Sequence, residues 1–173
     1  PVHRVSIVQR GIAALGYTMQ LPTEDRYLMT RSELLDRLCV MLGGRVAEEI
    51  VFKEISTGAQ NDLQRAAGIA RSMVTEYGMT DKFGPLTFEK ERRPLFLDIG
   101  LPSGAKEYSE DTAREIDQEV KRLIDEAYVR VKTTLTANQD KLKTLAAVLL
   151  EKETVEGDEI RKLLGLPEKK KEP

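Results

Sequence analysis

The stretch that decides the fold is residues 43–79, GGRVAEEIVFKEISTGAQNDLQRAAGIARSMVTEYGM, in which two helical patterns meet across a short polar turn. Apolar residues recur at helical spacing before the turn, from Leu34 to Ile50, and small or apolar residues recur after it, from Leu63 onward. Residues 56–61 include serine, threonine, glycine and asparagine, which favour turns and helix starts. The stretch therefore predicts two consecutive helices joined by a tight connection.

The first of these helices has a clear start signal. Thr30, followed three residues later by Glu33, forms a capping box, which predicts a helix over about residues 31–51. Gly43 and Gly44 lie in the middle of this helix, and each costs about 1 kcal/mol relative to alanine. Glycines inside a helix usually mark the close approach of another backbone, so we expect a neighbouring segment to pack here.

The second and third helices are predicted to be amphipathic. The expected buried face of the second consists of Leu63, Ala66, Ala67, Ala70, Met73, Val74 and Tyr77. Ser109 is predicted to cap the third helix. On the surface of that helix, the charge spacing predicts ion pairs one turn apart, such as Asp117 with Lys121 and Glu126 with Arg130.

The remaining segments downstream are predicted from shorter signals. A capping box at residues 136–139 begins a fourth helix, and the apolar spacing of residues 160–164 predicts a short last one. Residues 80–108 carry turn chemistry and little periodicity, so we expect a long, mobile connection there. The lysine-rich residues 168–173 are expected to form a disordered tail.

Two short segments near the start of the chain alternate apolar and polar side chains, which is the pattern of β-strands. They are residues 4–9 and 17–21, separated by a loop with glycines near both ends and followed by Pro22, which ends the second strand. They predict an antiparallel β-hairpin. The expected fold class is therefore mainly α, as one domain over residues 1–167 with a small antiparallel β-hairpin near its N-terminus.

Composition limits the partners that this chain can have. The 173 residues carry a formal net charge of −2, with 5% aromatic residues and no tryptophan. Nucleic-acid binding relies on clustered positive charge and on aromatic stacking, so no nucleic acid is expected as a partner. No apolar run approaches the roughly 18 residues that would cross a bilayer, so this part of the protein is expected to work in water.

Few side chains indicate chemistry by themselves. Asp62 lies near the predicted start of the second helix, where an aspartate can cap the helix, interact with its dipole or bind a metal. Glu48 and Glu49 are adjacent carboxylates, which on an amphipathic helix are mostly solvated and less often an acid–base pair. His3, the only histidine, favours a strand or surface role, because one histidine cannot build the usual three-ligand zinc site. Cys39, the only cysteine, favours a buried, unreactive thiol in a reducing compartment.

Several longer motifs follow one another in a definite order. The hairpin is followed by GGRVAEEIVF, STGAQNDL, AGIARSMVTEYGMTDKFGPLTF and YSEDTAREIDQEV. This order closely resembles the peptidase domain of the FtsH family, the membrane-anchored ATP-dependent zinc metalloproteases of bacteria, mitochondria and chloroplasts. In that family, zinc is held by two histidines of an HExxH helix and by an aspartate that matches Asp62. The resemblance places that helix, with its general-base glutamate, upstream of Pro1, so no catalytic residue is expected in this chain.

The resemblance also implies the activity and the assembly of a larger protein. It implies a helical metallopeptidase domain, with one zinc per subunit, that degrades unfolded or membrane proteins by attack of zinc-activated water on peptide bonds. ATP would bind in a preceding ATPase domain and not to this chain, and the parent protein would be a homo-hexamer. Membrane attachment would come from parts outside this chain, with this domain on the cytoplasmic side of a bacterial plasma membrane.

Polypeptide substrates are expected to bind at the N-terminal hairpin. An edge strand offers unpaired backbone groups to an extended peptide, and the hairpin directly follows the expected position of the HExxH helix. The candidate substrate-binding residues are Gly16, Tyr17, Thr18 and Met19. A second class of function stays open, which is a non-catalytic helical oligomerisation or adaptor module whose third and fourth helices supply an interaction surface.

Overall fold

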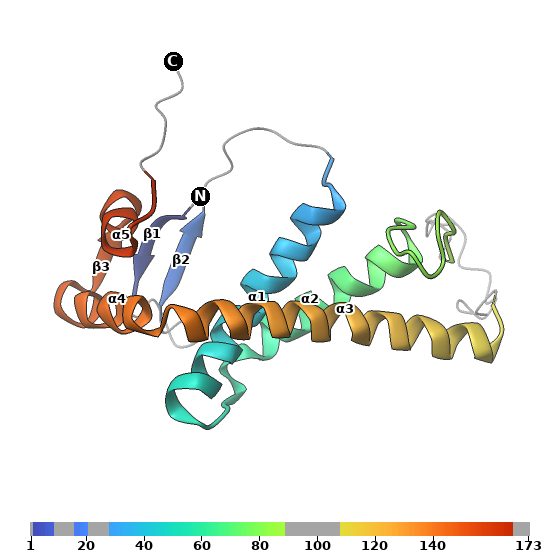
Figure 1. Ribbon diagram of the computed structural model, residues 1–173, viewed down its shortest axis with the longest axis horizontal. Helices are drawn as coiled ribbons and strands as arrows, with labels where there is room; N and C mark the ends of the chain where they lie inside the picture. The colour runs from blue at the N-terminus through green and yellow to red at the C-terminus, as the bar shows by residue number, and fades with distance from the viewer. Residues whose placement is uncertain (1, 9–15, 21–27, 89–107, 168–173) are drawn as a thin grey trace, which may run out of the picture. The chain divides into compact units, whose positions relative to one another are not determined.

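The computed structural model describes residues 2–8, 16–20, 28–88 and 108–167 (Figure 1). The chain divides into two compact units. We call residues 28–134 the helical unit, and the residues before 28 together with those after 134 the mixed unit. The described parts of both units lie within the residues that the sequence predicts to be one domain.

The described residues of the helical unit form three long helices and one short 3₁₀ helix. They are α1 (Arg31–Phe52), the 3₁₀ helix η1 (Thr57–Ala59), α2 (Gln60–Thr75) and α3 (Glu110–Ala137), whose last turn extends beyond the unit. Each long helix buries one apolar stripe, and the most completely buried large side chains are Leu38, Val46, Met73, Val74, Ile116 and Leu123. All six lie at positions where the helical spacing of apolar residues predicts burial.

The start of α1 confirms the predicted capping box. The Glu33 N–H donates to the Thr30 hydroxyl oxygen at 3.3 Å, and the Thr30 N–H donates to a Glu33 carboxylate oxygen at 2.7 Å. Both contacts satisfy backbone groups that have no partner within the helix. The helix ends at Phe52, because Lys53 adopts a left-handed conformation with φ of 58°. The predicted range of about 31–51 is confirmed.

The expectation that another segment packs closely on the middle of α1 is wrong. A Cβ atom placed on Gly43 or Gly44 would meet no atom within 4 Å among the described residues. The buried stripe of α1 runs instead through Leu38, Leu42 and Val46. Gly43 is half-buried and Gly44 is exposed, so both lie outside this stripe and no described segment approaches them closely.

The buried face of α2 is narrower than the sequence predicts. Ala66, Ala70, Met73 and Val74 are buried, whereas Leu63, Ala67 and Tyr77 are exposed. Tyr77 lies beyond Thr75, where α2 ends, so helical spacing no longer determines its direction. Leu63 and Ala67 lie within α2 but remain open to solvent.

Ion pairs one turn apart form along α3 as predicted, but with other partners: Lys121 pairs with Asp125, and Arg122 with Glu126. Asp117 and Arg130 have partners on other helices instead. Asp117 accepts a hydrogen bond from Arg71 of α2 at 2.8 Å. Arg130 forms a 2.8 Å ion pair with Asp36 of α1. Packing brings these opposite charges together, and a tertiary partner replaces the weak pair that i,i+4 spacing favours.

The part of the mixed unit that the structure describes forms a three-stranded antiparallel sheet and two helices. Its strands are β1 (Val2–Ser6), β2 (Tyr17–Gln20) and β3 (Thr154–Glu156), in the order β2-β1-β3, and its helices are α4 (Gln139–Lys152) and α5 (Gly157–Leu164). The predicted hairpin of β1 and β2 is confirmed. The third strand was missed, because three residues are too few to show an alternating pattern. Leu149, Val155 and Ile160 form the buried centre of this unit.

Two glycines allow backbone segments of the mixed unit to approach closely. A Cβ atom on Gly16 would lie 2.6 Å from the Ser6 carbonyl oxygen. A Cβ atom on Gly157 would lie 2.3 Å from the Val2 carbonyl oxygen. Neither distance is compatible with a side chain, so both glycines are required for β1 to pack against its neighbours.

The predicted boundary between the third and fourth helices is wrong by a few residues. Thr136 lies inside α3, which continues to Ala137, and Asn138 is the N-cap residue of α4. At the start of α3, Ser109 caps as predicted, since its hydroxyl accepts the Thr112 N–H at 3.1 Å.

The long connection between α2 and α3 is described in its first part. Thr80 and Gly84 form an isolated antiparallel bridge, and the Phe88 N–H donates to the Thr75 carbonyl oxygen at 2.7 Å. The rest of the expected mobile connection and the expected disordered tail lie outside the described residues. None of the described helices combines the length and the apolar character needed to cross a membrane.

Candidate metal site

Asp62 is presented by the first turn of α2. It is the third residue of the helix, and its side chain is exposed. Ala59 occupies the N-cap position, so Asp62 is not the capping residue. Among the described residues, no hydrogen bond or ion pair engages the Asp62 carboxylate. The favourable interaction of its charge with the helix dipole remains, and the carboxylate oxygens are free to bind a cation.

The turn that leads into α2 is tied to α1 through Ser56. The hydroxyl of Ser56 donates to one carboxylate oxygen of Glu48 at 2.8 Å, and its N–H donates to the other at 3.2 Å. The same hydroxyl accepts the Gly58 N–H at 3.1 Å and caps η1. Arg45 donates to the Ser56 carbonyl oxygen at 3.1 Å. One residue thus joins α1 to the segment that begins α2.

Glu48 and Glu49 bind different partners and do not form an acid–base pair. Glu49 accepts hydrogen bonds from Lys132 at 2.8 Å and from the Tyr128 hydroxyl, which links α1 to α3. The Lys132 contact, followed by the Tyr128 contact, lowers the pKa of Glu49. Hydrogen bonds from Ser56 lower the pKa of Glu48. Neither carboxylate is only solvated, and each is engaged in its ionised form.

These lowered pKa values predict how stability depends on pH. The unfolded chain takes up protons at both residues before the folded chain does, so their stabilising contribution is present above the ordinary glutamate pKa of 4.5. This stabilising contribution is lost as the pH falls through the lower pKa values that the two glutamates have in the folded chain. We expect the free energy of unfolding to fall with acidification, and to fall less steeply in a Glu48→Gln, Glu49→Gln double variant. Urea unfolding at several pH values between about 3 and 7 gives the free energy of unfolding of each protein as a function of pH. Equal slopes for the parent and the double variant would contradict the prediction.

The chemistry of Asp62 fits zinc, as one ligand of a larger set. A carboxylate oxygen is an ordinary zinc donor, and this one is exposed and unengaged among the described residues. The described segments contain no group of three or more His, Cys, Asp or Glu residues placed to hold a metal ion. His3 lies exposed in β1, in agreement with the strand or surface role predicted for it. Asp62 is therefore the metal-ligand candidate of this part of the chain.

Cys39 is half-buried on α1 and not fully buried as expected. Its sulfur lies 3.9 Å from the Ala127 carbonyl oxygen of α3. Burial raises the pKa of the thiol and outweighs the opposing effect of Arg130. A raised pKa leaves less reactive thiolate at neutral pH, which agrees with an unreactive cysteine.

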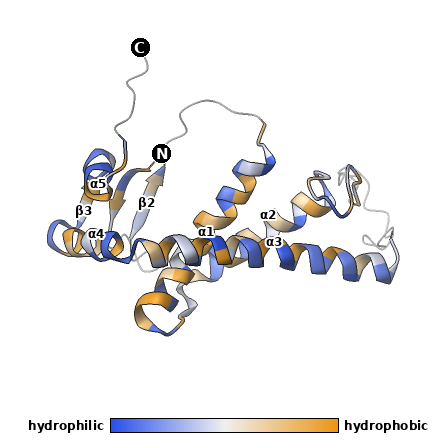
Figure 2. Cartoon of the chain, viewed as in Figure 1, coloured by the Kyte–Doolittle hydropathy of each residue, from blue (hydrophilic) through white to orange (hydrophobic). Residues whose placement is uncertain are grey.

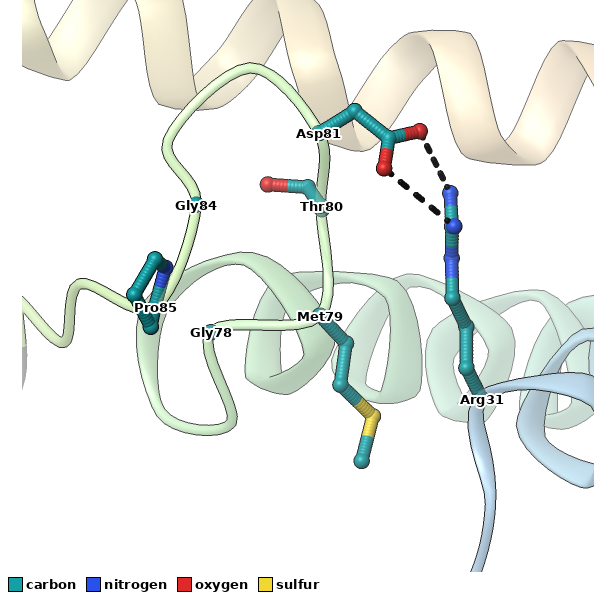
Figure 3. Close-up of a pocket in the computed structure, with 7 residues that line it drawn as sticks. All are labelled: Arg31, Gly78, Met79, Thr80, Asp81, Gly84 and Pro85. Atoms are coloured by element: carbon teal, nitrogen blue, oxygen red, sulfur yellow. Dashed lines mark hydrogen bonds and ion pairs between the residues drawn. The ribbon is translucent and has the colours of Figure 1, made fainter.

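The pocket in Figure 3 lies at the far end of α2 from Asp62. It has a volume of about 460 Å³ and is lined by Arg31, Gly78, Met79, Thr80, Asp81, Gly84 and Pro85. Arg31 pairs there with Asp81 at 3.1 Å. The 16 residues of α2 span roughly 24 Å, so this pocket cannot hold a group that is also bound by Asp62.

The candidate substrate-binding residues lie at the edge of the sheet in the mixed unit. Tyr17, Thr18 and Met19 belong to β2, and Gly16 directly precedes it. β2 pairs with β1 on one side only, in the register Ser6 with Tyr17. Its other edge has no partner strand among the described residues. Gly16 has a structural role as well, because of its close approach to β1.

Apolar side chains are exposed at the end of α1 and in the turn that follows it. Val51, Phe52 and Ile55 are 46%, 72% and 59% exposed. Figure 2 shows this end of the helix as a hydrophobic region. We call these three residues the apolar patch, and the sequence did not single them out.

Comparison with known proteins gives a consistent family. The model of Peptidase family M41 matches residues 1–163. A protein of Syntrophobacter fumaroxidans named ATP-dependent zinc metalloprotease FtsH is 60% identical over 93% of this chain and 25% of its own length. Proteins with the same name from Ralstonia pickettii and Thermotoga maritima are 55% and 48% identical, each over 95% of this chain and over 23% and 27% of their own lengths.

This chain spans about a quarter of the length of these curated relatives. The family match covers nearly all of the chain, including the Gly43–Met79 stretch, the whole helical unit and most of the mixed unit. The resemblance that the ordered motifs indicate is therefore confirmed, and the chain belongs to peptidase family M41.

Proposed function

We propose that this chain is the proteolytic part of a membrane-anchored, ATP-dependent zinc metalloprotease that degrades unfolded or membrane proteins. The observation that carries the proposal is the exposed carboxylate of Asp62, which has no partner among the described residues and stands in the STGAQNDL motif. When bound, zinc lowers the pKa of a coordinated water toward about 7 and polarises the peptide carbonyl. The general-base glutamate and two histidine ligands would come from an HExxH segment upstream of Pro1.

In this proposal the residues of the chain hold and position the reactants. Asp62 supplies an anionic oxygen to the metal from the first turn of α2. The positive end of the helix dipole interacts favourably with a negative charge at this position. The open edge of β2 binds the polypeptide in extended form through backbone hydrogen bonds, which do not depend on the substrate's side chains. Such contacts suit a protease that must accept many sequences.

Proline substitutions in β2 test the binding of substrate by strand addition. Consecutive N–H groups of a strand point to opposite edges, so Thr18→Pro and Met19→Pro remove donors from different edges of β2. We expect the variant that loses the outward donor to keep its melting temperature and lose most peptide hydrolysis. The variant that loses the inward donor is expected to be destabilised, because pairing with β1 is broken.

The two proline variants thus control for each other. Thermal unfolding identifies which donor faces β1, and hydrolysis of an unstructured peptide by the full-length protein reports binding. Full-rate hydrolysis by the variant that retains the parental stability would exclude strand addition at this edge.

The proposal includes an assembly and a location. The parent protein would be a homo-hexamer that binds ATP in a preceding ATPase domain and is anchored in a bacterial plasma membrane, with this domain on the cytoplasmic side. Light scattering of the detergent-solubilised full-length protein is expected to give the mass of six subunits. A monomer at micromolar concentration would contradict this.

A non-catalytic oligomerisation or adaptor module is the second candidate function. The apolar patch favours it, because exposed apolar side chains next to one another often mark contact surfaces. Zinc distinguishes the two candidates. The protease is supported if the full-length protein holds one zinc per subunit, if a chelator abolishes proteolysis as it removes the zinc, and if added zinc restores proteolysis. A full-length protein that never binds zinc supports the adaptor.

A further inference from the structure

We propose that Ser56 is a positioning residue, whose hydroxyl fixes the first turn of α2 and thereby the direction in which Asp62 presents its carboxylate. This inference rests on the proposed function, in which Asp62 binds zinc. It adds a residue that does not touch the metal and that acts through the backbone between α1 and α2.

The contacts of Ser56 make it the centre of the connection between the helices. Its hydroxyl donates to Glu48 on α1 at 2.8 Å and accepts the Gly58 N–H at 3.1 Å. Its N–H also donates to Glu48, and its carbonyl oxygen accepts from Arg45. Three different groups of one residue are therefore held by α1, while the hydroxyl alone reaches forward into η1.

The segment that leads from Ser56 to Asp62 is short and helical, so the contacts that hold Ser56 on α1 also restrain the position of Asp62. η1 follows Ser56 directly and α2 follows η1 without a gap, so the backbone from Thr57 to Asp62 is helical throughout. Ala59 is 7% exposed and anchors the middle of the segment in the core. Without the hydroxyl, the Gly58 N–H loses its acceptor. Ser56 is then held only through its N–H, by Glu48, and through its carbonyl oxygen, by Arg45. The first turn of a helix is the part that frays most readily, and Asp62 lies in that turn.

Gly58 lies close to both the Ser56 hydroxyl and the Glu48 carboxylate. A Cβ atom on Gly58 would lie 3.3 Å from the Ser56 hydroxyl oxygen and 3.7 Å from a Glu48 carboxylate oxygen. A side chain at this position would press against the hydroxyl that accepts the Gly58 N–H. The hydroxyl contacts both α1 and the start of η1 directly.

The test compares Ser56→Ala, which removes the hydroxyl, with Ser56→Thr, which retains it, in the full-length protein. Zinc affinity is measured by competition with a chromophoric chelator, and amide exchange at Gly58 is measured in the zinc-free protein. We expect Ser56→Ala to weaken zinc binding about 10-fold, as groups that orient a metal ligand usually do, and to speed exchange at Gly58. Ser56→Thr is expected to restore most of both properties. Thr57→Ala, which removes the neighbouring exposed hydroxyl, is the matched control and should change neither.

Each outcome decides the inference. Parental zinc affinity in Ser56→Ala overturns it, and so does an equal loss in Thr57→Ala, which would show that any truncation in the turn has the same effect. If Ser56→Ala does not fold, Glu48→Gln replaces it, because the amide keeps the shape but accepts fewer hydrogen bonds; unchanged affinity there overturns the inference. Failure of the proposed function gives a different result from failure of this inference. In that case the parent protein would bind no zinc, or the Asp62→Asn variant would still bind it.

Discussion

Replacing Asp62 by asparagine in the full-length protein is expected to reduce proteolysis and zinc occupancy by at least about 100-fold, while ATP hydrolysis and assembly continue. The expected loss is at least as large as that seen when a group supporting a metal ligand is removed. Asparagine keeps the size of the side chain and removes the anionic charge that attracts the cation. No hydrogen bond or ion pair joins Asp62 to another described residue, so the free energy of unfolding should change by less than about 1 kcal/mol, the limit set by loss of its interaction with the helix dipole.

Asp140→Asn is the matched control for this substitution. Asp140 is an exposed aspartate in the first turn of α4, so it loses the same charge at a comparable helix position. Zinc content is measured by atomic emission and proteolysis by degradation of unfolded casein. If the Asp62→Asn variant keeps the zinc content and the casein degradation rate of the parent, Asp62 is not a zinc ligand. Its only role is then the favourable interaction of its charge with the helix dipole.

Replacing Gly157 by alanine is expected to lower the free energy of unfolding by about 3 kcal/mol, as other overpacked sites in protein cores do. The added Cβ would lie 2.3 Å from the Val2 carbonyl oxygen and 3.1 Å from that of His3. Both atoms belong to the backbone of β1, which cannot move away without breaking its pairing with β2 and β3. Chemical denaturation of the chain, followed by circular dichroism, measures the loss.

Gly43→Ala is the control with the opposite expected sign. Its Cβ would meet no described atom within 4 Å, and alanine favours the interior of a helix over glycine by roughly 0.5–1 kcal/mol. We therefore expect this variant to be slightly more stable than the parent. A Gly157→Ala protein as stable as the parent would show that β1 and α5 are not held as closely as described.

Local signals in the sequence were sufficient for most helix boundaries. The capping box at Thr30 and the cap at Ser109 each involve residues three positions apart, so the contacts form within one turn and depend little on the rest of the fold. The period of the apolar residues likewise predicts which face of each helix is buried. The same kind of signal placed Asp62 near a helix start, where the structure has it. It failed for Thr136, because the continuing pattern of α3 outweighs a capping signal inside it.

The sequence by itself determined the mainly helical class, the N-terminal hairpin, the position of Asp62 and, through the order of its motifs, the family. Only the tertiary structure decided that Glu49 binds Tyr128 and Lys132 while its neighbour Glu48 binds Ser56. Adjacent residues on a helix point about 100° apart, so these two carboxylates necessarily reach different neighbours. Which neighbours they reach depends on segments eight and about eighty residues away, which meet α1 only when the apolar faces of the helices pack together.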